Sequence, residues 1–241
     1  MFHYFRLPLI LISFSVLFAA CSKDNDASHS RTGQEKPDSS NVYGDANFSY
    51  MDSLETYQTG YNTVRDSAYK AENIKELEKQ TLLIKKHPDN PGPYLDRGNH
   101  YQNIQMYKQA IDDYNFYINK VQDNYSAYLN RGTALERIKQ YEPALSDYEK
   151  VLELKPDDTI ANFNRGIVYD VLGRYDESIK EYSEVIVKDP RLAKAYYNRG
   201  LAYEKIKNYE EAIHDLTRAL ELNPKYGNIL KQKIEYINRK K

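Results

Sequence analysis

Apolar residues between positions 91 and 226 recur at helical spacing in two blocks, and this pair of blocks returns every 34 residues. In the last copy, Tyr196 belongs to the first block, and Ala212 and Leu216 belong to the second. Such spacing places the apolar side chains on one face of a helix. Pro224 follows the second block, where a helix cannot continue. The pattern therefore predicts a helical hairpin, repeated four times without a gap.

Four glycines, each directly after an arginine, set the frame of the repeat. They are Gly98, Gly132, Gly166 and Gly200. The frame divides the chain into the contiguous units 91–124, 125–158, 159–192 and 193–226. A fixed period of this length is typical of a solenoid, because one hairpin cannot bury its apolar face alone and must stack on its neighbours. We therefore expect an all-α solenoid.

The repeat resembles the tetratricopeptide repeat (TPR), whose pattern runs from an aromatic residue to Gly, Tyr, Ala, a second aromatic residue and Pro. The fourth unit carries at these places Tyr196, Gly200, Tyr203, Ala212, Leu216 and Pro224. The other units match closely, although Gln122 replaces Pro in the first. Two departures recur: the chain has no Trp, and Arg stands where the family pattern has Leu. The resemblance implies a right-handed α-solenoid of TPR hairpins with capping helices at both ends.

The segment before the four units, 48–90, is interpreted as a degenerate repeat or an N-terminal cap. Pro88 is in phase with the prolines of the later units, but Val64 stands where the glycine should be. We expect a helix over 71–87, packed on the first full unit, after a degenerate first helix over 50–70. Terminal units are expected to be atypical, because one of their faces must meet water.

The segment after the units, 227–241, carries four aliphatic side chains on one helical face. They are Ile229, Leu230, Ile234 and Ile237. We expect a C-terminal capping helix. Its basic residues complement the helix dipole, with a contact to a membrane or an acidic partner as the alternative.

Residues 1–20 have the pattern of a secretory signal, with Arg6 before an apolar run that extends from Leu7 to Ala20. The run is too short for a membrane span, which needs about 20 apolar residues. Its end resembles the lipobox of a bacterial lipoprotein, with two alanines before Cys21, the lone cysteine of the chain. The resemblance implies a TPR lipoprotein of a Gram-negative bacterium, with acyl chains on Cys21. The alternative is an ordinary signal peptide followed by a single thiol.

Residues 21–47 are rich in Ser, Asp, Asn and Gly. They carry too little apolar surface to offset the entropy of ordering, so we expect a disordered tether. Ser22 to Asp26 resemble the tract that directs lipoproteins of some Gram-negative groups to the outer face of the outer membrane. The alternative is that they only begin the tether. The expected location is the outer membrane, lipid-anchored, facing either the periplasm or the exterior.

The charge balance and the motifs narrow the function. With 34 basic and 35 acidic residues, no unit has the basic excess that phosphate neutralisation requires, so we expect no nucleic-acid partner. The sequence lacks a Gly-rich phosphate loop, the H-E-x-x-H and G-x-S-x-G motifs and a second cysteine, and its five histidines show no ligand spacing. We therefore expect no catalytic residue, metal, cofactor or small-molecule substrate.

The 24 tyrosines raise the alternative of a glycan-binding surface. Between residues 91 and 226, however, 13 of the 17 fall at the fourth, eleventh, seventeenth and twenty-fourth places of the unit. Those are packing places of the family, where Tyr supplies a large apolar area with a polar tip. The four others are Tyr117, Tyr125, Tyr197 and Tyr226.

Opposite charges recur at two places of every unit. The seventh place is always Arg: Arg97, Arg131, Arg165 and Arg199. The twenty-third place is always acidic: Asp113, Asp147, Glu181 and Asp215. This regularity predicts a ladder of ion pairs within or between hairpins. The alternative is eight independent solvated charges.

The resemblance also implies a peptide-binding groove, because in TPR arrays the first helices line a concave face. The fifth and ninth places supply an apolar strip, Leu95, Leu129, Phe163, Ile167, Tyr197 and Leu201. The sixth place supplies Asn130, Asn164 and Asn198, whose amides can both donate to and accept from the backbone of an extended peptide. The alternative is that Asn merely tolerates a partly exposed helix face and that the N-terminal segment covers the strip.

The carboxylate clamp of the family, which grips a C-terminal carboxylate, matches this chain only at Asn99 and Asn130. Leu95, Ile160 and Asn164 stand where its cations should be. We therefore expect an internal or apolar peptide segment as ligand, rather than a free C-terminus.

These patterns together predict a membrane-anchored scaffold or adaptor that binds a peptide segment of another protein in its groove. One alternative is a structural component of an envelope or secretion assembly that uses its outer helix surfaces. Another is a glycan binder or an enzyme, which would need a constellation of residues that the sequence lacks.

Overall fold

The computed structural model describes the backbone of residues 62–241 and side chains from residue 69 onward, all within one compact unit, Thr59–Lys241. The described part contains helices and no strand, which confirms the predicted all-α fold. The signal segment, Cys21 and the tether lie outside the described residues. No helix within the described range is both long enough and apolar enough to cross a membrane.

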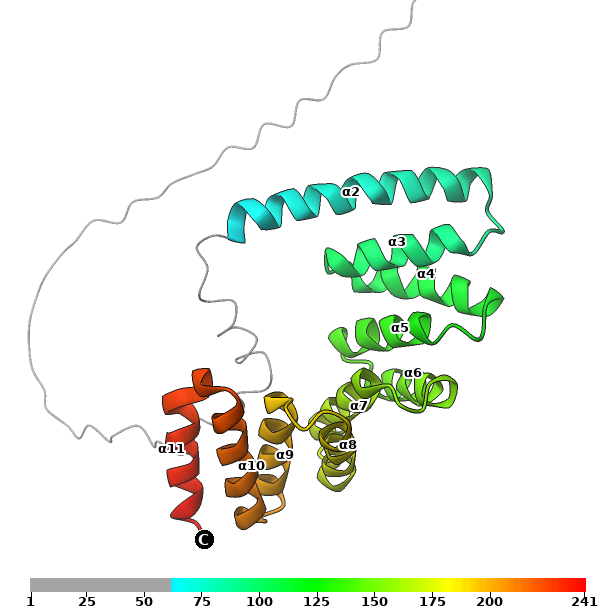
Figure 1. The fold of residues 1–241 in the computed structure, drawn as a ribbon. Helices are drawn as coiled ribbons and strands as arrows, with labels where there is room; N and C mark the ends of the chain where they lie inside the picture. Colours follow the sequence, from blue (N-terminus) through cyan, green and yellow to red (C-terminus); the bar gives the residue numbers. More distant parts are fainter. Residues whose placement is uncertain (1–61) are drawn as a thin grey trace, which may run out of the picture. The chain divides into compact units, whose positions relative to one another are not determined.

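Four helical hairpins coincide with the four sequence units (Figure 1). They are α3 (Gly92–Asn103) with α4 (Tyr107–Lys120), α5 (Tyr125–Arg137) with α6 (Tyr141–Leu154), α7 (Thr159–Val171) with α8 (Tyr175–Lys188), and α9 (Ala193–Lys205) with α10 (Tyr209–Leu222). Each helix contacts the next along the chain, and successive first helices also contact each other. The hairpins therefore stack in sequence order as an α-solenoid.

Helix boundaries follow local sequence signals. Asn124 accepts hydrogen bonds from the backbone N–H groups of Ser126 and Ala127, and Asp158 accepts one from Ala161, so each caps the helix that follows it. Asn124 and Asp158 are each the last residue of a unit, so both caps lie at the junction of two hairpins. Within each hairpin the turn is made by the fifteenth residue of the unit, whose φ is positive in all four copies.

The glycine of each unit allows close packing inside its hairpin. A Cβ on Gly132 would lie 2.8 Å from a ring carbon of Tyr148, closer than real contacts allow. Tyr114, Tyr148 and Tyr182 occupy the same place in three units and are fully buried. The first helix can therefore approach the second only because the residue facing the tyrosine ring has no side chain.

The N-terminal cap differs from the expectation. Residues 62–86 form one continuous helix, α2 (Asn62–Lys86), so the predicted division between a first helix over 50–70 and a second over 71–87 is wrong. The physical reason is that the three residues in phase with the turns of the later units, Lys70 to Glu72, are strong helix formers, with Ala71 at the place where the later units have a positive φ. The part of 50–70 before residue 62 lies outside the described residues.

Helix α2 packs on α3 through polar as well as apolar side chains. Asn73 is buried, and its Oδ1 lies 2.9 Å from His100 Nδ1 and accepts a hydrogen bond of 3.0 Å from Asn103 Nδ2. Gln80 is also buried. The cap is thus joined to the first repeat by a specific hydrogen-bond pattern.

At the other end, a 3-10 turn, η2 (Pro224–Tyr226), leads into α11 (Gly227–Asn238), which packs on α10. Leu230 and Ile237 are buried there, as the apolar face of the segment predicted. Lys233 Nζ lies 2.7 Å from Glu204 Oε2 on α9, and both side chains are largely shielded from water. A capping helix therefore covers the last hairpin.

Candidate functional site

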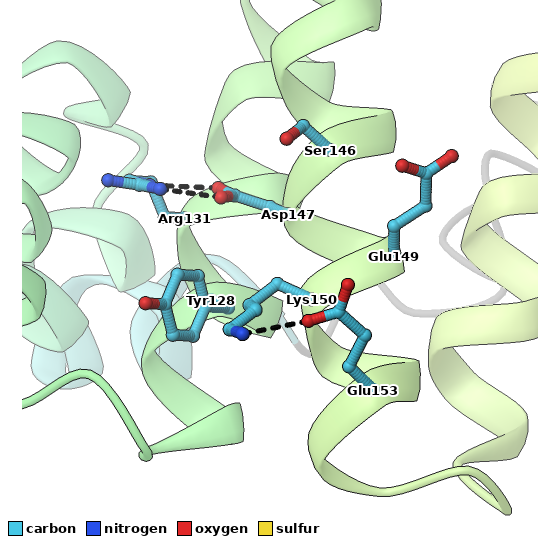
Figure 2. Close-up of a pocket in the computed structure, with 7 residues that line it drawn as sticks. All are labelled: Tyr128, Arg131, Ser146, Asp147, Glu149, Lys150 and Glu153. Atoms are coloured by element: carbon cyan, nitrogen blue, oxygen red, sulfur yellow. Dashed lines mark hydrogen bonds and ion pairs between the residues drawn. The ribbon is translucent and has the colours of Figure 1, made fainter.

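The structure brings each arginine of the seventh place against the acidic residue 16 positions later, in the same hairpin. In three units the arginine donates two hydrogen bonds to one carboxylate. Arg97 Nε and Nη2 lie 2.7 Å from the two oxygens of Asp113. Figure 2 shows the same two-bond arrangement for Arg131 and Asp147. Paired bonds of this kind are stronger and more directional than one bond between neutral groups.

The same arginines also reach the preceding helix. Arg97 Nη1 donates to Thr81 of α2 at 3.3 Å, and Arg131 Nη1 donates to Asn115 of α4 at 2.8 Å. In the fourth unit, Arg199 pairs with Asp215 and its Nη1 donates to Ser183 of α8 at 2.9 Å. Each of these arginines therefore connects three helices.

The third pair is incomplete. Arg165 donates one hydrogen bond, from Nη2 to Glu181 Oε1 at 2.8 Å. Within the described part of the chain, Arg165 Nε and Glu181 Oε2 are buried and have no hydrogen-bond partner. Asn162 stands at the fourth place, where the other units put a tyrosine ring near the guanidinium. The third pair is consequently the least well satisfied of the four.

The pocket drawn in Figure 2 lies on the α5–α6 hairpin and contains one of these pairs. Its lining residues are Tyr128, Arg131, Ser146, Asp147, Glu149, Lys150 and Glu153. Arg131 is bonded to Asp147, and Lys150 Nζ lies 2.7 Å from Glu153 Oε2. Much of its charge is thus paired within the hairpin, so this pocket is a weak candidate for a ligand site.

The surface formed by α3, α5, α7 and α9, here called the first-helix face, carries the predicted apolar strip. All six strip residues are half-buried. Leu95 and Leu129 pack against the buried core. The Phe163 ring lies 5.7 Å from the Tyr182 ring, and the Tyr197 ring lies 5.8 Å from the Tyr226 ring. These side chains therefore serve packing and leave only part of their area for a ligand.

The asparagine side chains of the sixth place make more contacts within the protein than the sequence suggests. Asn130 Nδ2 donates to Asn99 Oδ1 at 2.9 Å, and the Tyr114 hydroxyl donates to the same oxygen. Asn164 lies beside the Tyr148 hydroxyl. Asn198 is 3% exposed and lies beside the Tyr182 hydroxyl.

The sequence assigned no role to the residues at the twelfth place of the unit, which are Gln102, Glu136, Asp170 and Glu204. The Tyr148 hydroxyl donates to Glu136 Oε2 at 2.9 Å, and the Tyr182 hydroxyl donates to Asp170 Oδ2 at 2.8 Å. An acidic residue at this place in three consecutive units was the signal that could have identified the row.

Burial changes the acidity of these carboxyl groups. Desolvation raises the pKa of Asp170 to about 6, although the nearby Ser178 hydroxyl and the hydrogen bond from Tyr182 act in the opposite direction. Desolvation also raises the pKa of Glu136 above its usual value, against a lowering effect of the hydrogen bond from Tyr148. Among the described residues, no group of three His, Cys, Asp or Glu side chains is placed to hold a metal ion.

Comparison with known proteins identifies the repeat. The tetratricopeptide repeat profile matches residues 125–158 and 193–226, and a second TPR repeat profile matches residues 172–207. No curated protein sequence matches the chain.

Two solved structures are similar to this chain in fold. A crystal structure of MamA is 27% identical, with a TM-score of 0.60 over 62% of this chain and 87% of its own. A structure of YrrB, a TPR protein with an unusual peptide-binding site, is 27% identical, with a TM-score of 0.61 over 68% of this chain and 86% of its own.

Proposed function

We propose that this chain, which contains tetratricopeptide repeats, is a scaffold or adaptor that binds a peptide segment of another protein on its first-helix face. The observation that carries the proposal is the strip of half-buried apolar side chains along four consecutive first helices, next to half-buried polar groups. The similarity to YrrB, a peptide-binding TPR protein, supports it. An extended segment can lie along such a strip and bury its own apolar side chains there.

We also propose that the scaffold is anchored to the outer membrane through lipid on Cys21. The support is the sequence alone, in which a short apolar run ends in two alanines before the lone cysteine. Several acyl chains give a stable anchor, where one chain gives only marginal binding.

Photo-crosslinking in intact cells tests where the partner binds. A photoreactive amino acid is placed at each exposed residue of the thirteenth place, on the first helices: Asn103, Arg137, Val171 and Lys205. The matched controls are the exposed residues of the twenty-second place, on the second helices: Asp112, Ser146, Lys180 and His214. We expect one partner protein to be attached from the first set and not from the second.

A partner attached from the second helices and not from the first would favour a structural component of an envelope or secretion assembly. That alternative has its own support, because Leu82 on α2 is 60% exposed and Val187 on α8 is 77% exposed, and both lie on helices outside the first-helix face. Permanent contacts through such residues would place the crosslinks on the second helices. Crosslinks confined to the second helices would overturn binding on the first-helix face.

A further inference from the structure

The buried and half-buried acidic groups of residues 69–241 fall into two classes. Eight form an ion pair with an arginine or a lysine: Glu76, Asp113, Asp147, Asp158, Glu177, Glu181, Glu204 and Asp215. Glu136 and Asp170 do not. Each of these two accepts a hydrogen bond from a tyrosine hydroxyl, which is neutral.

These two carboxyl groups occupy one region of the first-helix face. They are the twelfth residues of adjacent units and lie on α5 and α7, two helices that contact each other. Burial raises the pKa of the Tyr182 hydroxyl, and the charges of Asp170 and Glu136 raise it further. The two groups therefore share a neighbourhood in the middle of the array.

Unsatisfied polar atoms mark the same place. Asp170 Oδ1 is buried and has no hydrogen-bond partner among residues 69–241. Asn198 is 3% exposed, and its Nδ2 has none either, although the side chain lies beside the Tyr182 hydroxyl. Native proteins satisfy nearly all buried polar atoms, so two unsatisfied atoms around one tyrosine hydroxyl indicate a group that is still to be supplied.

Among the described residues, no lysine or arginine forms an ion pair with Glu136 or Asp170. Arg137 and Lys205 stand next to the twelfth place on their helices, are exposed, and influence Glu136 and Asp170 only through space. A desolvated carboxylate without a cation is costly, and an opposite charge brought close to it stabilises the ionised form.

We propose that Glu136 and Asp170 receive a cationic side chain, Lys or Arg, from the peptide segment bound on the first-helix face. The proposal rests on the proposed function and adds the charge of the ligand to it. Ile167 lies one helical turn before Asp170 and is half-buried. It offers an apolar surface to the methylene groups of the same Lys or Arg, whose charged end then reaches the carboxylates.

The experiment compares peptides selected by two forms of the full chain. A phage library of random dodecapeptides is selected on the wild type and on the double variant Glu136→Gln, Asp170→Asn. The amide oxygens still accept from Tyr148 and Tyr182, so the fold is expected to persist, and thermal unfolding checks it. The matched control is Glu142→Gln, Asp176→Asn, which removes the two exposed carboxylates at the eighteenth place of the same two units.

We expect wild type and control to select peptides with Lys or Arg beside apolar residues. In the E136Q/D170N variant this basic preference should disappear while the apolar preference stays. For one selected peptide with Lys, replacing that Lys by norleucine should weaken binding to wild type at least tenfold and leave binding to the variant unchanged.

The remaining outcomes separate the two proposals. Peptides without a basic preference, or a preference that the double variant keeps, would overturn the cationic ligand and leave a peptide-binding face. If neither wild type nor control selects any peptide, the proposed function itself fails, and the cationic ligand fails with it.

Discussion

At the residue scale, the arginine of the seventh place performs two tasks with one planar group. Its Nε and Nη2 hold a carboxylate of the same hairpin, and its Nη1 reaches the helix before it, as Arg131 does with Asp147 and Asn115. Lysine could not do both, because its ammonium group lacks this fixed fork of donors. In three of the four units, the arginine that departs from the family pattern thus joins its hairpin to the preceding helix.

The incomplete third pair leads to a stability prediction. The other three units use Asp at the twenty-third place, where the third uses Glu181, whose Oε2 is buried without a partner. We expect Glu181→Asp to restore the two-bond arrangement with Arg165 and to raise the free energy of unfolding by about 1 kcal/mol. Chemical denaturation measures it.

The reverse substitution is the control for that pair. Asp147→Glu should weaken the two-bond pair with Arg131 and lower stability by a similar amount. Equal losses from both substitutions would show that the longer carboxylate is not the cause of the poor third pair.

A second residue-scale prediction concerns pH. The pKa of Asp170 is about 6 in the folded protein, above the ordinary value of 3.8. The folded state therefore binds a proton more tightly than the unfolded state, and ionisation lowers stability as pH rises from about 4 to above 6. Asp170→Asn keeps the hydrogen bond from Tyr182 but cannot ionise.

We expect D170N to match wild type in stability at pH 4 and to exceed it by about 1–3 kcal/mol at pH 8. The groups that face Asp170 are Tyr182, Ser178 and Lys205. Denaturation of both proteins at the two pH values measures the difference. A difference that does not change with pH would contradict the raised pKa.

At the scale of elements, the sequence predicts the four hairpins well, because the glycine, the tyrosines and the proline repeat in phase. It predicts α2 poorly. A frame shifted back by 34 residues suggests two helices there, but hairpin formation needs a turn, and the equivalent residues Lys70 to Glu72 are strong helix formers that continue the helix. Periodicity alone cannot distinguish a long capping helix from a degenerate repeat when the turn signal is lost.

The candidate site was predictable in part. The arginines and their acidic partners could be chosen from their regular spacing, and the structure brings them together. The burial of Asn198 could not be predicted, because it depends on Tyr182, whose hydroxyl approaches from another helix. For the same reason, the hydrogen-bonding role of Glu136 and Asp170 at the twelfth place can be recognised only when the tyrosine hydroxyls of the second helices are located.

The hairpin turn supplies a prediction at this scale. The fifteenth residue of each unit has φ near +64°, except that Gly173 has +73°. Gln105, Lys139 and Lys207 adopt this left-handed conformation at a cost of about 1 kcal/mol each relative to glycine. We expect Lys139→Gly to raise the free energy of unfolding by about 0.5–1 kcal/mol.

Gly173→Ala is the matched test at the equivalent turn, and it should lower stability by about 1 kcal/mol. No atom lies within 4 Å of the position that its Cβ would take, so the cost would come from backbone strain rather than from a clash. Thermal unfolding of the two variants measures both effects. A stabilising G173A would contradict the strain argument.

At the scale of the whole molecule, the arginines that connect three helices join neighbouring hairpins to each other. Arg97, Arg131 and Arg199 each bond to the preceding unit or cap. At the junction of α6 and α7, Glu149 takes the equivalent place and makes no hydrogen bond to Arg165 among the described residues. In a solenoid, stability is approximately a sum of unit and interface contributions, so this interface should be the weakest.

The last prediction concerns how this array is held at a membrane. No described helix can cross a bilayer, and Cys21 lies outside the described residues, so the anchor is a proposal from the sequence. We expect Cys21→Ser to abolish incorporation of labelled palmitate and to move the protein from the membrane fraction to the soluble fraction, because the thiol is the attachment point. Ser22→Ala, next to it, should leave both unchanged. If C21S stays in the membrane fraction and is still cleaved after residue 20, then the apolar run is an ordinary signal peptide, and the repeats must reach the membrane through a partner.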